Sequence, residues 1–259
     1  MNYKEVENYS YARYILKLKK LCEAHEINME IIGYEDFERI GQRYPLYRIM
    51  VNPEADKRMC IVAGVQAYEI AGPLSMLDIF ANPEDVFNDH VSYRIYPCIN
   101  PTSFDLRQRT DDDDVDLNQL SKDSLKDKRY REVRAFCDDI KCDMEAWKMD
   151  IFLTLHEDVD LKEFYAYVFE EKTEPIYRKI IERWRYDFGG ILKDEKIYGD
   201  VLEDGLIINR HDESFEDYLF TNKITRLAIC TETPGLLPLE SRVKMNIDNI
   251  RILSDHLIN

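Results

Sequence analysis

Polar side chains that could do chemistry follow several apolar, strand-like runs of the sequence, at the point where each run ends. These are Glu69 after the run 58–65, His156 after 150–155 and Glu232 after 227–230. The strands themselves do not need these residues, and the ends of different strands meet at one edge of an α/β sheet. Two carboxylates and an imidazole at such an edge could hold a metal ion and a general base together. Each of these residues taken singly also fits an ordinary capping or solvated position. The prediction of a metal site therefore depends on all three residues occurring together.

Gln66 belongs to the same region, because it precedes Glu69 by three residues in the segment Ala63–Glu69. The segment follows a buried strand and precedes apolar residues with helical spacing over 70–80. Both side chains are therefore expected at a strand-to-helix corner, with free backbone donors at the start of the helix. A glutamine offers only a neutral amide oxygen, which is a poorer zinc ligand than an imidazole.

The elements that must position these residues alternate along the chain between strands and helices. Strands are expected at 30–34, 44–51, 58–65, 91–96, 149–155, 164–169 and 227–230, and helices at 11–25, 70–80, 128–140, 174–188 and 239–257. Asn100-Pro101 is expected to open an irregular, strongly charged region. This alternation implies an α/β sheet covered by helices on both faces. At 259 residues the chain can bury one substantial core, so we expect a single domain over residues 1–259.

Composition limits the function classes. The chain has 51 acidic and 35 basic residues, and the resulting net charge of −16 argues against nucleic-acid binding and favours a soluble protein or a cationic partner. No run is apolar enough for a membrane span, and residues 1–10 are too polar for a signal peptide, so we expect a cytoplasmic protein. The cysteines are scattered without a Cys-x-x-Cys pair and are expected to be reduced core thiols. Composition leaves the oligomeric state open.

These residues and their neighbours resemble the zinc carboxypeptidase family, which includes the carboxypeptidase A and B type and bacterial amidase and desuccinylase-like relatives. The resemblance extends from about Tyr44 to Leu257 and keeps the order of the family's motifs. The matching pieces are Ala63–Glu69, Asn100-Pro101 with Arg109, Val115–Gln119, Leu155–Asp158 and Thr231–Pro234. The resemblance implies a single α/β domain with a central twisted sheet of mixed parallel and antiparallel strands and helices on both faces.

The resemblance also implies a role for each residue. One zinc ion would be held by Gln66, Glu69 and His156, at positions where the family has two histidines and a glutamate. Glu232 would be the general base for a zinc-activated water that cleaves a peptide or amide bond. Arg109 would stabilise the oxyanion, although a surface arginine that neutralises the aspartates 111–114 is the alternative interpretation.

Three further positions of the resemblance concern the substrate and the first ligand. Asp116 would accept a hydrogen bond from the Gln66 amide and so turn the carbonyl oxygen toward the metal. Asn118 and Gln119 occupy the positions where the family grips a substrate carboxylate, but Gln119 replaces an arginine. A neutral amide cannot form the bidentate ion pair that arginine makes.

Two hypotheses therefore remain open for this sequence. The first is a metal-dependent hydrolase with an altered ligand set, because Glu69, His156, Glu232 and Arg109 are all present. The second is an inactive relative whose cleft binds a peptide or protein partner, because Gln66 and Gln119 replace the expected residues. The resemblance further implies a tyrosine on a mobile loop, for which Tyr198 and Tyr218 are both available. His25, His90 and His211 are alternative metal ligands, although each also fits an ordinary surface position.

Overall fold

The apolar runs of the sequence become strands of one sheet, which has eight strands in the part of the chain that the structure describes. The structure is a computed structural model and describes residues 3–37, 41–109, 117, 131–142, 147–171, 176–187, 190–193, 196–212 and 214–259. The strands of the sheet are β1 (Met29–Phe37), β2 (Gln42–Val51), β3 (Lys57–Ala63), β4 (Val91–Tyr96), β5 (Met149–Asp158), β6 (Tyr165–Glu170), β9 (Leu206–Ile208) and β10 (Thr225–Pro234). A separate small hairpin consists of β7 (Lys196–Ile197) and β8 (Asp200–Val201).

The sheet is mixed, as expected. Its strand order is β1-β2-β4-β3-β5-β10-β6-β9. The central strands β4, β3, β5 and β10 run parallel to one another, whereas β2 and β6 pair antiparallel with their inner neighbours. The carboxyl ends of β3, β5 and β10 therefore lie at the same edge of the sheet, which is where the polar residues are.

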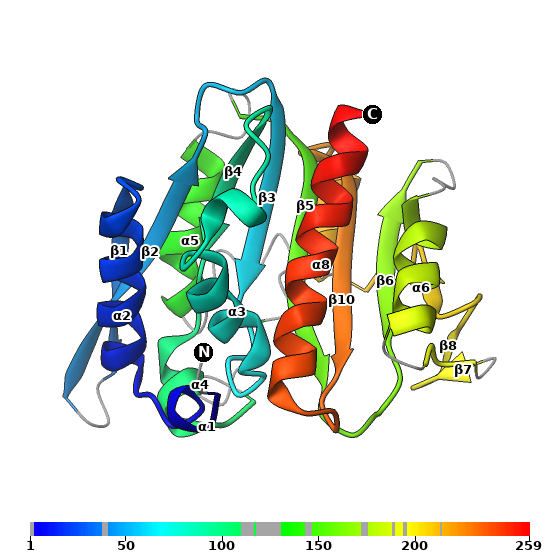
Figure 1. The fold of residues 1–259 in the computed structure, drawn as a ribbon, viewed down its shortest axis with the longest axis horizontal. Helices are drawn as coiled ribbons and strands as arrows, with labels where there is room; N and C mark the ends of the chain where they lie inside the picture. The colour runs from blue at the N-terminus through cyan, green and yellow to red at the C-terminus, as the bar shows by residue number, and fades with distance from the viewer. Residues whose placement is uncertain are drawn as a thin grey trace.

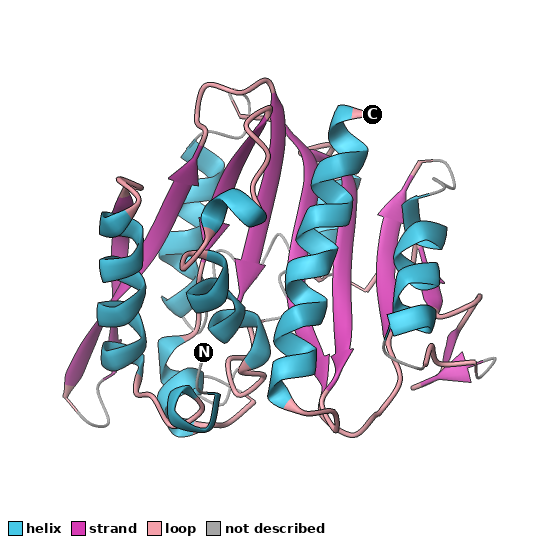
Figure 2. Ribbon diagram, viewed as in Figure 1, coloured by secondary structure: helices cyan, strands magenta, loops and turns pink. Residues whose placement is uncertain are grey.

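Helices cover both faces of the sheet (Figures 1 and 2). They are α1 (Tyr3–Val6), α2 (Tyr11–Ala24), α3 (Ala71–Ile79), α4 (Pro101–Leu106), α5 (Arg131–Cys142), α6 (Ile176–Asp187), α7 (Phe215–Thr221) and α8 (Leu239–Ile258), with a 3-10 turn η1 (Pro83–Asp85). In Figure 1, α2, α3, α6 and α8 lie in front of the sheet and α5 lies behind it.

Each face of the sheet has its own apolar core. The core beneath α2, α3, α6 and α8 contains Ile151 and Leu153 of β5, whereas Phe152 packs into the core beneath α5 and α7. Successive side chains of a strand point to opposite faces, so this alternation fixes which face every later residue of β5 must occupy.

The expected elements are confirmed in type, with local corrections. The region after Asn100 is not irregular at its start, because Pro101 begins the helix α4 and the Asn100 side chain caps it by accepting a hydrogen bond from the Ser103 N–H, 3.0 Å away. His156 and Glu232 lie inside β5 and β10 rather than after them. None of the helices in the described ranges combines the length and apolar character that a membrane span requires.

Candidate active site

The corner between β3 and α3 places Gln66 and Glu69. The chain leaves β3 at Gly64, whose φ of +66° belongs to the left-handed region, and a Cβ there would lie 2.8 Å from the Cys98 Sγ. Only glycine meets both requirements without strain. A turn then follows, in which the Glu69 N–H donates to the Gln66 carbonyl oxygen at 2.9 Å. Both side chains are almost fully buried.

The strand register brings His156 and Glu232 side by side. In the parallel pair β5 and β10, His156 is the partner of Glu232, and Glu232 is in turn the partner of Tyr165 on β6. The next row toward the sheet interior on the same face contains Thr154, Cys230 and Tyr167. These two rows form the floor of a cleft, because the alternation that sends Phe152 into the core sends the side chains of these rows out of the sheet on the same face.

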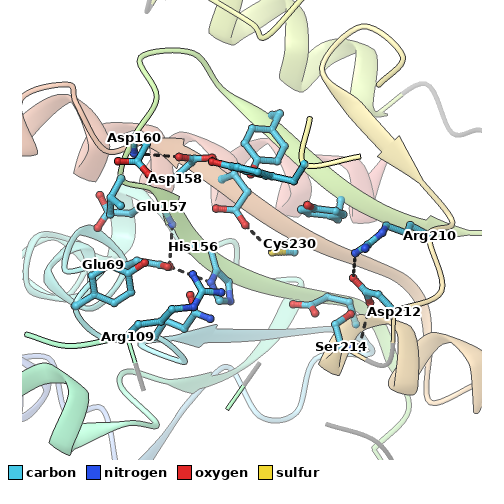
Figure 3. Close-up of a pocket in the computed structure, with 18 residues that line it drawn as sticks. Glu69, Arg109, His156, Glu157, Asp158, Asp160, Arg210, Asp212, Ser214 and Cys230 are labelled. Atoms are coloured by element: carbon cyan, nitrogen blue, oxygen red, sulfur yellow. Dashed lines mark hydrogen bonds and ion pairs between the residues drawn. The ribbon is translucent and has the colours of Figure 1, made fainter. Parts of the chain in front are cut away.

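Glu69 and His156 meet directly. The His156 Nδ1 lies 3.0 Å from the Glu69 Oε2, and the same oxygen accepts a hydrogen bond of 3.0 Å from the Glu157 N–H. Figure 3 shows these two side chains pointing toward one another, with Arg109 beside them. The other ring nitrogen of His156, Nε2, is buried and has no hydrogen-bond partner among the described residues.

The side chain of Glu157 points to the opposite face of the sheet from His156, where it contacts the helices α3 and α8. Its carboxylate accepts a hydrogen bond of 2.6 Å from the N–H of Ala71, the first residue of α3, and forms an ion pair with Arg242 of α8. A carboxylate at a helix N-terminus satisfies an otherwise free backbone donor. This contact fixes the helix that follows Glu69 against the strand that carries His156.

The cleft has a volume of about 480 Å³ and is lined mainly by carboxylates and tyrosines. Asp158 accepts hydrogen bonds of 3.0 Å from both Tyr165 and Tyr198, and Figure 3 shows it beside Asp160 at the same end of the site. Tyr198 lies in the turn of the β7–β8 hairpin and is 70% exposed, so it forms part of the rim. Tyr218 instead packs against the apolar cluster beneath α5 and α7.

Carboxylates dominate the electrostatics. Burial by itself would lower the pKa of the His156 imidazole, but Glu69, Glu232 and Glu216 outweigh it and raise that pKa to about 9. Burial raises the pKa of Glu232 above the usual range of a glutamate, with Glu69 acting in the same direction and His156 against it. Burial and Glu232 hold the pKa of the Cys230 thiol well above its ordinary value, so Cys230 is not a nucleophile by itself.

The structure brings together five of the residues that the sequence singled out. Gln66, Glu69, Arg109, His156 and Glu232 all line the cleft. The cleft-lining residues do not include His25, His90 or His211. Asp116, Asn118 and Gln119 lie outside the described residues.

Sequence reasoning missed several residues of the cleft. Cys230 carried a usable signal, because it precedes Glu232 by two positions on one strand and therefore shares its face. Tyr165 lies beside Glu232 only through the pairing of β6 with β10. Glu216 carried no such signal. It belongs to a short helix, where Thr154 donates a hydrogen bond to one of its carboxylate oxygens while the other is buried without a partner in the described part of the chain.

The fold of this chain resembles that of α/β proteins solved as metallopeptidases and carboxypeptidases. Solved structures of this class that resemble it include proteins named as candidate metallopeptidases from Shewanella amazonensis and Shewanella baltica. The first has a TM-score of 0.79 and 24% identity, covering 95% of this chain and 92% of that chain. The second has a TM-score of 0.77 and 26% identity, covering 95% and 91%.

A metallo-carboxypeptidase from Burkholderia cenocepacia has the same fold, with a TM-score of 0.68, 18% identity and coverage of 96% of this chain and 69% of that chain. No protein-family model matches the sequence, and no curated protein sequence does. The structural comparisons therefore show the fold.

The donor set of the cleft fits a divalent cation. Glu69 and His156 offer a carboxylate and an imidazole whose nearest atoms are 3.0 Å apart, and Gln66, whose side chain is an amide, lines the same cleft. Carboxylate, imidazole and amide oxygen are all groups that bind divalent metals, although the amide binds weakly. Further carboxylates around His156 leave an excess of negative charge that a bound cation would offset.

Proposed function

We propose that this protein is a metal-dependent hydrolase of the carboxypeptidase type that cleaves a peptide or amide bond. The observation that carries the proposal is the Glu69–His156 contact of 3.0 Å with Glu232 in register beside His156 on the neighbouring strand. Two metal donors and a carboxylate base then share one cleft. The resemblance of the fold to metallopeptidases and carboxypeptidases supports the same class.

In this proposal Gln66, Glu69 and His156 would hold one zinc ion. The ion would supply Lewis-acid activation of a water molecule and of a substrate carbonyl. The carboxylate of Glu157 holds the Ala71 N–H behind the site and so keeps the Glu69 loop in place against β5. Asp116 is assigned the role of orienting the Gln66 amide.

Glu232 is assigned the role of general acid and base. Its carboxylate takes a proton from the attacking water and returns it to the leaving amine. The raised pKa suits this exchange, because a group that titrates closer to neutral pH both accepts and donates a proton readily. Glu232 is partly exposed at the cleft floor, so water can reach it.

Substrate binding is assigned to Arg109, Asn118 and Gln119. Arg109 lines the cleft beside Glu69 and stabilises the negative charge that develops on the carbonyl oxygen. Asn118 and Gln119 contact the substrate through neutral amides. Without an arginine at 119, the chain should not require a free terminal carboxylate in its substrate.

The test combines metal analysis with hydrolysis. The protein is loaded with zinc and assayed against peptides and N-acyl amino acids with free and with amidated C-termini. Glu232→Gln should lose at least about 100-fold in kcat while keeping its zinc content, because general-base catalysis contributes about 100- to 10,000-fold. Glu203→Gln, an exposed position, is the matched control. Zinc-loaded protein that hydrolyses none of these substrates, or a fully active Glu232→Gln variant, would overturn the proposal.

The competing interpretation is an inactive cleft that binds a peptide or protein partner. It is favoured by the neutral amide of Gln66 in a position where the cleft needs a strong metal donor. It predicts no zinc uptake even at excess metal. Absence of zinc uptake therefore favours the inactive cleft, whereas zinc uptake has to be followed by the hydrolysis assay.

A further inference from the structure

Cys230 introduces a sulfur donor into the cleft that the proposed hydrolase does not use. One ring nitrogen of His156, the Cys230 Sγ and a carboxylate oxygen of Glu232 all lie within 4.8 Å of one another. The three residues come from the neighbouring strands β5 and β10 and belong to adjacent rows of the same sheet face. Figure 3 shows Cys230 joined to a carboxylate of the cleft by a marked contact.

The orientation of the His156 ring favours a metal ligand. Its Nδ1 is engaged with the Glu69 carboxylate at 3.0 Å, whereas the buried Nε2 has no partner among the described residues. A carboxylate that accepts the proton of one ring nitrogen fixes the tautomer and leaves the other nitrogen free to bind a metal. In this arrangement Glu69 orients the histidine and is not itself a ligand.

The spacing of the other two donors fits a tetrahedral ion. The Cys230 Sγ lies 3.7 Å from the Glu232 Oε1. Zinc–sulfur and zinc–oxygen distances in a tetrahedral site predict about 3.5 Å between two such donors. A small side-chain adjustment is therefore enough for both atoms to bind the same cation.

The charges near the cluster also favour a cation. The carboxylates of Glu69, Glu216 and Glu232 all act on His156. Arg242 is paired with Glu157 behind the sheet, and Arg210 is shared between Asp200 and Asp212 at 2.5 and 2.8 Å. Neither arginine is committed to the carboxylates around His156. Arg109, which lies beside Glu69 and His156, faces several glutamates, so a metal ion would offset the remaining negative charge.

We propose that His156, Cys230 and Glu232 form a second binding site for a divalent cation in this cleft. This site prefers thiophilic ions such as Cd²⁺. A thiolate is a soft ligand and is preferred by such ions over carboxylate or amide oxygen. On binding, the Cys230 thiol and the protonated His156 ring each give a proton to solvent, and a metal–sulfur and a metal–nitrogen bond form. The cation also occupies the Glu232 carboxylate. It would therefore block the general base, and this inhibitory consequence alone rests on the proposed function.

The experiment uses the full chain, freed of metal and titrated with Co²⁺. A thiolate bound to Co²⁺ gives a charge-transfer absorption in the near ultraviolet that nitrogen and oxygen ligands do not give. We expect this band to grow until one ion is bound per chain and to be absent in Cys230→Ser. Cys22→Ser, which removes a buried thiol of α2 remote from the cleft, is the matched control and should keep the band.

Glu69→Gln separates the two modes of metal binding. If Glu69 only orients His156, this variant should keep the band but require about 10- to 100-fold more cobalt, the usual cost of losing an orienting partner. Cobalt bound by the wild type without the band, a band that persists in Cys230→Ser, or no cobalt bound at all would overturn the inference.

A second measurement does not depend on the folding of any variant. Cd²⁺ added to the metal-free wild type should give a cadmium–thiolate absorption in the ultraviolet that stops growing at one ion per chain. Cd²⁺ that binds without this absorption would contradict the inference. Zinc-dependent hydrolysis without a cobalt–thiolate band would support the proposed function and exclude the metal site at Cys230. A cobalt–thiolate band without hydrolysis would support the metal site at Cys230 and exclude the proposed function.

Discussion

At the scale of the single residue, Gln66 decides how strongly the cleft can bind zinc by the proposed set. Its side chain is buried at the corner after β3 and lines the cleft with Glu69 and His156. An amide oxygen carries no charge, whereas an imidazole is a strong zinc ligand. The glutamine at residue 66, and not the residues around it, is therefore what limits the zinc affinity of the proposed site.

We predict that Gln66→His raises zinc affinity by at least about 100-fold, because even orienting partners of a ligand contribute about 10- to 100-fold. Competition with a zinc chelator of known affinity measures the change. Gln42→His on β2, outside the cleft, should leave the affinity unchanged. An unchanged zinc affinity in Gln66→His would mean that the side chain of residue 66 does not reach the metal.

His156 gives the metal-free protein a predictable pH dependence. Its carboxylate neighbours raise the pKa from the ordinary value near 6.5 to about 9, so the folded state holds the proton more tightly than the unfolded state. This contribution to stability is complete below about pH 6.5 and is lost as the pH rises through about 9.

In the presence of a chelator, the Tm of the wild type should therefore fall between those pH values. The Tm of His156→Asn should fall less steeply. His90→Asn, at an exposed position, should keep the wild-type slope. Parallel curves for the wild type and His156→Asn would exclude His156 as the titrating group.

At the scale of the element, the corner between β3 and α3 is the part of the site that tolerates least change. Gly64 has a left-handed backbone, and the position of its absent Cβ is occupied by Cys98 and Pro73. Gly72 lies just as close to the backbone of β5, since a Cβ there would be 2.8 Å from the Leu155 carbonyl oxygen. The loop that carries Gln66 and Glu69 is thus held by two close approaches.

Gly64→Ala should lower the free energy of unfolding by more than the roughly 1 kcal/mol that a left-handed backbone costs a residue with a side chain. Gly41→Ala is the matched control, because Gly41 has φ +63° but no atom within 4 Å of its Cβ position. Urea unfolding of both variants measures the difference, which isolates the contact with Cys98. Equal losses in the two variants would show that the contact costs nothing.

At the scale of the whole molecule, one face of the sheet carries the cleft and the other packs against the helix α8. His156 points into the cleft, while its neighbour Glu157 points to the other face and meets the closing helix α8 through Arg242. The helix α8 packs there against α3 and α6. The strand β5 therefore carries a cleft residue, His156, and next to it Glu157, whose ion pair with Arg242 connects the last helix to the centre of the sheet.

Arg242→Met should destabilise the fold by about 3–5 kcal/mol, because it leaves the carboxylate of Glu157 buried without its charge partner. Combining it with Glu157→Leu should recover part of that loss, since an apolar pair often replaces a buried ion pair at little cost. Thermal and urea unfolding measure both variants. A double variant no more stable than Arg242→Met would show that the Glu157 contact with the start of α3 matters more than the ion pair.

The sequence predicted the central features of this fold from local pattern. Apolar runs such as 58–65 and 227–230 identified the buried strands, and the strand-to-helix corner at Gln66 and Glu69 is confirmed. Short elements such as α4 and α7 were missed, since a few residues carry too little periodicity to be recognised. The roles of Gln66, Glu69, Arg109, His156 and Glu232 stay predictions, although all five residues share one cleft.

The residue types at the strand ends could be read from the sequence, because side-chain periodicity and turn chemistry are local properties. Which of these residues meet depends on the folded arrangement of the strands. The pairing of His156 with Glu232 and the contact of Glu69 with His156 depend on the order and register of β3, β5 and β10 in the sheet. Register is set by packing between segments distant in the sequence, where a slip of one residue would turn the whole strand over. For the same reason Cys230, an ordinary core thiol in the sequence, lies beside a histidine and a glutamate in the folded protein.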